Sequence, residues 1–152
     1  KAFGSELNKN DFARICYKVE RINLGIEGGW QDQLTTIYGG FNVMEFRSDS
    51  FRVIPIVVEK SFYDLLSSEL YIVDLKLPHN SGDLHARQAK DIEIIMPSLH
   101  KNVELALEME RAISRNSYQE FKDIMRMAWL TKKNTHKSIS SKKIENIFLS
   151  FF

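Results

Sequence analysis

The sequence has 152 residues, in which 21 Lys and Arg nearly balance 20 Asp and Glu for a net charge of +1. A chain of this length fits one ordinary domain or two small lobes, and it can bury roughly two thirds of the surface that its unfolded form exposes. The balanced charge removes the electrostatic reason to expect nucleic acid or an anionic membrane as a partner. A small molecule or another protein is therefore the expected partner.

Cys16 is the one cysteine of the sequence, which excludes an internal disulfide and fits a reducing compartment. No apolar run approaches the roughly 18 residues that a helix needs to span a bilayer. No basic-then-apolar leader pattern is found either. We therefore expect a cytoplasmic protein without a membrane partner.

The first expected element is a helix over residues 10–22, with Asn8 or Asn10 as its N-cap. Apolar side chains recur there at helical spacing: Phe12, Ile15, Cys16, Val19 and Ile22. Residues 25–40 follow, a stretch that holds five of the seven glycines. Between its glycine pairs, residues 32–38 have the length of a helical turn or two.

Strand signals come next in the chain. Residues 41–46 and 51–58 are rich in aromatic and β-branched side chains and are separated by four polar residues, which predicts a hairpin. Pro55 favours an edge or irregular strand. A short helix is expected near residues 61–68, followed by a buried strand over residues 70–77.

The pattern changes near residues 77–83, and only helices are expected beyond them. Two helical stripes carry the apolar residues: Leu99, Val103, Ala106, Leu107 and Ile113, and then Tyr118, Phe121, Ile124, Met125, Ala128 and Trp129. Pro97, residues 114–117 and residues 134–141 are expected to mark helix boundaries. The sequence thus predicts an α+β chain with strands early and helices late.

Asp32 is the candidate functional residue of the glycine-rich stretch. Gly28 and Gly29 precede it and Gly39 and Gly40 follow, which allows positive φ angles and a close approach of the backbone to a ligand. An Asp near a helix N-terminus stays ionised in the positive field there, as a carboxylate that accepts a hydroxyl proton must. Glycine pairs are also ordinary turn residues and a first-turn Asp is an ordinary capping residue. The residues alone leave both interpretations open.

Residues 25–46 resemble a segment of the GHMP small-molecule kinases, in particular the D-glycero-D-manno-heptose 7-phosphate kinases and related anomeric sugar kinases. The family segment reads G-x-x-G-G-x-Q-D-Q-x-x-x-x-x-G-G-x-N-x-x-E-F. The matching residues are Gly25, Gly28, Gly29, Gln31, Asp32, Gln33, Gly39, Gly40, Phe41, Asn42, Glu45 and Phe46. The preceding helix, residues 6–26, and the polar region at residues 79–88 are also similar to the family, so the resemblance covers most of the chain.

The resemblance implies a two-lobed GHMP kinase-like architecture, of which this chain is expected to hold a part. Residues 1–78 would lie in the N-terminal catalytic lobe, a ribosomal S5-like lobe with antiparallel strands. Residues 79–152 would form the mostly helical part of a ferredoxin-like C-terminal lobe. The family's phosphate loop is expected before residue 1 and a second glycine-rich motif after residue 152, so these residues alone are expected to be inactive.

The resemblance also implies the chemistry, which is ATP- and Mg²⁺-dependent phosphorylation of a sugar hydroxyl, most closely the anomeric hydroxyl of heptose 7-phosphate. Asp32 would lie beside the accepting hydroxyl as base or orienter. The implied substrate-binding residues are Gly28, Gly29, Gln31, Gly39, Gly40, Asn80 and Ser81. No metal ligand is assigned, because Mg²⁺ would be held mainly by parts outside the chain. A homodimer is left open.

Two positions are ambiguous against the family pattern. The family loop often carries an Arg before a small polar pair, where this sequence has His79 before Asn80, and Arg87 is the alternative cation. Trp30 is interpreted either as a residue of the sugar site or as a core residue. The rival hypothesis for the whole chain is a non-catalytic sugar-binding or protein-interaction fragment of a degenerate GHMP kinase.

Overall fold

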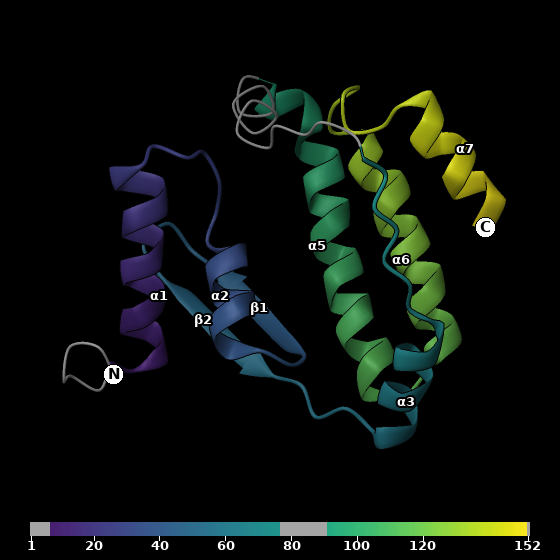
Figure 1. Ribbon diagram of the computed structural model, residues 1–152, viewed down its shortest axis with the longest axis horizontal. Coiled ribbons are helices and arrows are strands. Elements are labelled where there is room, and N and C mark those ends of the chain that lie inside the picture. Colours follow the sequence, from purple (N-terminus) through teal and green to yellow (C-terminus); the bar gives the residue numbers. More distant parts are fainter. Residues whose placement is uncertain (1–6, 77–90, 152) are drawn as a thin grey trace. The chain divides into compact units, whose positions relative to one another are not determined.

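The computed structural model describes residues 7–76 and 91–151. The chain falls into two compact units, residues 1–57 and residues 58–152 (Figure 1). Within the described part, one antiparallel pair of strands accompanies helices, and the predicted α+β class is confirmed. The predicted division between lobes after residue 78 lies outside the described residues and stays a prediction.

The first unit begins with helix α1, Lys9–Tyr17, which continues as the π-helix η1, Lys18–Asn23. Asn8 caps α1, because its side-chain oxygen accepts a hydrogen bond from the backbone N–H of Asp11 at 2.9 Å. The prediction of Asn8 as the cap is therefore correct. The predicted helix over residues 10–22 is also present, but its second half is wound as a π-helix, which periodicity alone does not reveal.

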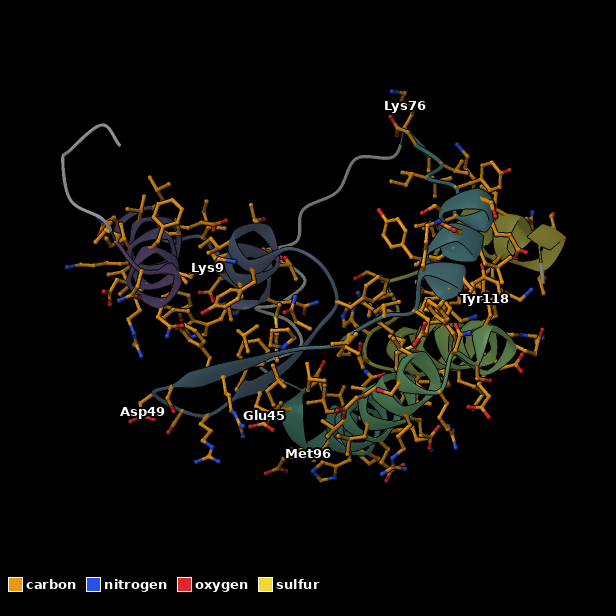
Figure 2. The ribbon with its side chains drawn as sticks, turned by 90° about the horizontal axis from the view of Figure 1, so that it is seen from below. Lys9, Glu45, Asp49, Lys76, Met96 and Tyr118 are labelled. Carbon is orange, nitrogen blue, oxygen red and sulfur yellow. The ribbon has the colours of Figure 1, made fainter. Side chains whose placement is uncertain are left out.

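Helix α2, Gln31–Tyr38, packs against α1 and supplies the core of this unit. Ala13 of α1 and Leu34 of α2 are fully buried. Figure 2 shows Lys9 between the two helices, where its amine donates a hydrogen bond to the carbonyl of Tyr38 at 3.4 Å. The helix predicted between the glycine pairs is thus confirmed.

The predicted hairpin is confirmed as well. Strand β1, Asn42–Phe46, pairs antiparallel with β2, Phe51–Pro55, so that Asn42 lies opposite Pro55. Pro55 is the last residue of its strand, a position where the missing N–H costs little. Asp49 lies in the turn and points away from the strands (Figure 2).

In the described residues of the second unit, the regular elements are helices. They are α3, Lys60–Glu69; α5, Ile92–Ser114; α6, Tyr118–Lys133; and α7, Lys142–Phe151. Helices α5 and α6 run side by side in opposite directions (Figure 1). Phe62 of α3 is 1% exposed, and its ring meets Tyr118 and Phe121 edge-on at centroid distances of 5.6 and 5.4 Å. None of the helices in the described part of the chain has the length and apolar composition to cross a membrane.

The buried strand predicted over residues 70–77 is wrong for the part that the structure describes. Residues 70–76 have no regular secondary structure, and Tyr71 and Ile72 are 80% and 96% exposed. A strand needs a hydrogen-bonded neighbour, and the sheet of the described residues contains β1 and β2. A short apolar run shows that a segment can be buried, but it does not show what the segment pairs with.

The helix boundary predicted at Pro97 is also wrong, because Pro97 lies inside α5. Proline removes one hydrogen bond of the helix and crowds the preceding turn. Here it stands in the second turn of a helix of 23 residues. The packing of the long remainder against α6 outweighs that local loss. The boundaries predicted at residues 114–117 and 134–141 are confirmed.

Glu145 joins α7 to α6 through an ion pair whose strength depends on pH. The Lys133 amine lies 2.7 Å from its carboxylate, and the Ser140 hydroxyl donates to the same group. Hydrogen bonds from Lys133 and then Ser140 lower the pKa of Glu145 below its ordinary value. Because the folded-state pKa is the lower one, the stabilisation is complete above the ordinary glutamate pKa and is lost as the pH falls through the folded-state value.

We therefore expect Glu145→Gln to lower the midpoint of thermal unfolding at pH 7 and to have a smaller effect at pH 2.5. Circular dichroism at 222 nm, recorded while the protein is heated, measures this difference. Glu110→Gln is the matched control, because Glu110 also lies on a helix of this unit and makes no ion pair with the described residues. A Glu145→Gln effect of equal size at both pH values would contradict the assignment.

Candidate active site around Asp32

Asp32 lies in the first turn of α2 with its side chain 83% exposed. The carbonyl of Trp30 receives the first hydrogen bond of this helix, from Leu34 N–H at 3.2 Å. Unpaired N–H groups at a helix N-terminus favour a nearby negative charge. Gln31, the first residue of α2, is exposed beside it. The helix therefore presents an open carboxylate that a hydroxyl group can approach.

Two glycines shape the loop before Asp32. Gly25 has a φ of +65° and ends η1 in the left-handed conformation that closes many helices. Gly28 has a φ of +153°, and a Cβ added there would lie 2.6 Å from the guanidinium carbon of Arg21. Gly29 has open space around it instead. Of the two predicted substrate-binding glycines in this loop, Gly28 is therefore the one whose missing side chain makes room for another residue.

Arg21 reaches from η1 into this loop. Its Nε donates to the carbonyl of Gly29 at 3.2 Å, and its Nη1 donates to the carbonyls of Ile26 and Glu27 at 3.3 and 3.1 Å. Its Nη2 lies 3.4 Å from Oδ2 of Asp32. The Arg21 side chain is only 9% exposed. One guanidinium thus joins three loop carbonyls to the candidate carboxylate.

Gly39 and Gly40 lie at the other end of α2, with φ angles of +64° and +68°. An eight-residue helix is about 12 Å long, so this pair stands well away from Asp32. The side chain of Asn42 donates to the carbonyl of Gly39 at 2.7 Å, which fixes the turn into β1. The structure therefore brings Gly28, Gly29 and Gln31 together with Asp32, and it places the second glycine pair apart from them. Substrate binding by all of these residues stays a prediction.

Gly39 combines a φ of +64° with a ψ of 173°, a backbone conformation that is nearly restricted to glycine. We expect Gly39→Ala to lower the free energy of unfolding by about 1–3 kcal/mol through backbone strain, because nothing lies within 4 Å of the added Cβ. Urea denaturation measures the loss. Gly29→Ala is the matched control for stability, since it also meets open space but has no positive φ. Equal losses in the two variants would refute the strain argument.

The ring contacts of Trp30 support the interpretation of this residue as a core residue. Its ring stacks on that of Tyr17 with a centroid distance of 3.6 Å and an interplanar angle of 6°. On another side it lies 5.2 Å from the ring of Phe51. Trp30 therefore ties α1, α2 and β2 together inside the first unit, a packing role that needs no ligand.

Several predicted positions lie outside the described residues. They are Asn80 and Ser81 of the predicted substrate site, with His79 and Arg87 of the same polar region. Among residues 7–76 and 91–151, no three His, Cys, Asp or Glu side chains come close enough to hold a metal ion. We therefore assign no Mg²⁺ ligand in the described part of the chain.

Sequence reasoning missed Arg21 and its neighbours. Oε1 of Glu20 lies 3.8 Å from Nη1 of Arg21. Oε2 of Glu20 accepts a hydrogen bond from the side-chain amide of the buried Gln33. A charged residue near a helix end is usually read as solvated, and nothing in the spacing marks these as inward-facing. The available signal was the absence of a side chain at Gly28, since a glycine often marks the close approach of another group.

The comparisons with known proteins bear on this segment directly. The family model described as the GHMP kinases N terminal domain matches residues 1–40, which include Asp32 and both glycine pairs. The crystal structure of a D-glycero-D-manno-heptose 1-phosphate kinase from Bacteroides thetaiotaomicron superimposes with a TM-score of 0.66 at 29% identity. It covers 87% of this chain. The resemblance to the GHMP kinases is confirmed.

Two curated relatives of this GHMP kinase-like chain are also kinases by name. The D-glycero-alpha-D-manno-heptose 7-phosphate kinase of Campylobacter jejuni is 26% identical over 97% of the chain. The bifunctional fucokinase/GDP-fucose pyrophosphorylase of Arabidopsis thaliana is 26% identical over 95% of it. The chain spans 46% and 14% of the lengths of these relatives, and 38% of the Bacteroides chain.

Proposed function

We propose that the protein containing this chain is an ATP-dependent sugar kinase of the GHMP type, with Asp32 beside the accepting hydroxyl. The observation that carries the proposal is the exposed Asp32 carboxylate at the start of α2, inside the segment that the family model matches. The kinase names of the relatives support it. A kinase of this kind would work in the cytoplasm, where ATP and a reducing environment are found.

The proposed site would need to supply only one acid–base group, because phosphoryl transfer depends mainly on positioning and charge stabilisation. The sugar oxygen forms a bond to the γ-phosphorus of ATP, and the bond from that phosphorus to the β–γ bridging oxygen breaks as ADP leaves. The hydroxyl proton passes to a carboxylate oxygen of Asp32. ATP and its Mg²⁺ would be bound by residues beyond those described, and they supply the phosphoryl group and its charge neutralisation.

The substrate that we propose is D-glycero-D-manno-heptose 7-phosphate, phosphorylated at its anomeric hydroxyl in a nucleotide-sugar pathway. The names of the Campylobacter and Bacteroides relatives support a heptose phosphate. Gly28, Gly29 and Gln31 would contact the sugar near Asp32. Gly39, Gly40, Asn80 and Ser81 complete the proposed binding residues, and a homodimer is compatible with the proposal.

The test is a substrate panel on the full-length protein, with ADP release as the measurement. The panel contains heptose 7-phosphate, unphosphorylated heptose and fucose. We expect ADP release with heptose 7-phosphate, and phosphorus NMR should place the new phosphate on the anomeric carbon. ADP release with fucose and with neither heptose would support the proposed kinase activity and contradict the proposed heptose substrate. The absence of release with every sugar would overturn the proposed activity.

A non-catalytic binding module is the second candidate function. The observation that favours it is an apolar hollow of about 700 Å³ in the second unit. It is lined by Glu69, Leu70, Tyr71, Val73, Trp129 and, from α7, Ile144, Ile147 and Phe148. Tyr71 and Val73 expose apolar side chains at its edge. Sugar binding by calorimetry without ADP release would favour this function over the kinase.

A further inference from the structure

We propose that Arg21 is a positioning residue, which holds the loop of residues 26–29 and one oxygen of Asp32 in the arrangement that phosphoryl transfer requires. The inference rests on the proposed kinase function, because it assigns to Arg21 a role that acts through Asp32. Arg21 touches neither the sugar nor ATP in this proposal.

The first argument is the number of bonds that one buried guanidinium makes. All three of its nitrogens donate, to the carbonyls of Ile26, Glu27 and Gly29 and to Asp32. A cation that is 9% exposed loses most of its hydration, so it stays buried only where such acceptors replace the water. The rigid fork of an arginine holds several acceptors in one fixed geometry, and the point charge of a lysine does not.

The second argument is the shape of the loop. Gly28 has no side chain at the place where a Cβ would lie 2.6 Å from the Arg21 guanidinium. Its φ of +153° also belongs to the conformations that other residues rarely adopt. The loop backbone therefore follows the shape of the guanidinium, and the fit of Arg21 into the loop depends on the absence of a side chain at Gly28.

The third argument is the direction of the contact with Asp32. Arg21 approaches Oδ2 of Asp32 at 3.4 Å, which leaves Oδ1 to accept from a sugar hydroxyl. The carboxylate itself remains 83% exposed and would otherwise rotate freely. Among the described residues, the Glu20 carboxylate also lies beside the guanidinium, at 3.8 Å, and it balances part of the positive charge. Arg21 thus limits the positions of a group whose placement within about 1 Å sets the rate.

Kinetics of Arg21→Ala and Arg21→Lys in the full-length protein test the proposal, with Arg52→Ala as the matched control. Arg52 belongs to the same unit and is 71% exposed on the hairpin, and its substitution by alanine removes the same charge. We expect Arg21→Ala to lower kcat roughly 30- to 100-fold with little change in the KM for ATP. Arg21→Lys should recover only part of the loss, and Arg52→Ala should keep the wild-type kcat. An unchanged kcat in Arg21→Ala would overturn the proposal.

A double-mutant cycle separates positioning from a general loss of structure. If Arg21 acts through Asp32, adding Arg21→Ala to Asp32→Ala should change the residual rate by less than about threefold. A further loss equal to that of the single variant would show that Arg21 acts independently of Asp32 and would overturn the proposal.

Hydrogen exchange without any substrate separates this inference from the proposed function. We expect the peptide over residues 24–32 to exchange about tenfold faster in Arg21→Ala and in Gly28→Ala, and at the wild-type rate in Arg52→Ala. Unchanged exchange in both site variants would overturn the fit between Arg21 and the loop, whatever the activity. A wild-type protein without kinase activity but with the expected exchange would overturn the proposed function and leave the fit standing.

Discussion

Asp32→Ala in the full-length protein is expected to lower kcat for sugar phosphorylation by about 10²- to 10⁴-fold, the usual contribution of a positioned acid–base group. The loss should appear in kcat and kcat/KM together, because the carboxylate acts on a proton that moves only in the transition state. The fold should remain intact, since the side chain is 83% exposed. Steady-state kinetics and a thermal unfolding curve measure the two effects.

Two further variants make the Asp32 result specific. Asp32→Asn keeps the size of the side chain and removes its basicity, so it should lose nearly as much activity as the alanine variant. Asp49→Ala removes another exposed carboxylate, at the turn of the hairpin, and should keep the wild-type rate. A turnover near the wild-type value in Asp32→Ala and Asp32→Asn would refute the proposed role.

Phe62→Ala is expected to lower the free energy of unfolding by about 3–5 kcal/mol, the typical cost of removing a phenyl ring from a core. Phe62 is 1% exposed and meets the rings of Tyr118 and Phe121 edge-on. Its loss removes both aromatic contacts and leaves a cavity between α3 and α6 that the rigid helices do not close. Urea denaturation followed by tryptophan fluorescence measures the change.

Tyr63→Ala is the matched control for this core position. Tyr63 is the next residue of α3 and carries a ring of similar size, but it is 57% exposed. We expect its loss to cost much less than that of Phe62, because little buried area disappears. Similar costs at the two positions would mean that α3 does not pack through Phe62 as described.

Patterns within short segments predicted most of the secondary structure. The helix around residues 31–38, the hairpin and the late helices depend on spacing, turn residues and β-branched content, which neighbouring residues carry together. Residues 70–76 show where this reasoning ends. Their composition suits a strand, but a strand exists only with a neighbour that composition does not name.

Pro97 shows a second limit of local reasoning. Its local preference is against a helix interior, yet α5 continues through it. The free energy of packing a long helix exceeds the cost of one missing hydrogen bond. The sign of that difference depends on how much of α5 meets α6, which is a property of the folded unit.

The sequence marked Asp32 and its flanking glycines as candidates, because the residue types and the spacing that resemble the GHMP kinases lie within one short segment. Their role in the site stays a prediction. The loop geometry that joins Arg21 to Asp32, eleven positions away, came only from the fold. That contact requires η1 to end just before Gly25 and the backbone at Gly28 to leave room for a guanidinium. Positive φ angles in the loop and the burial of Arg21, whose side chain is 9% exposed, bring the two charges together, and residue types alone do not reveal either feature.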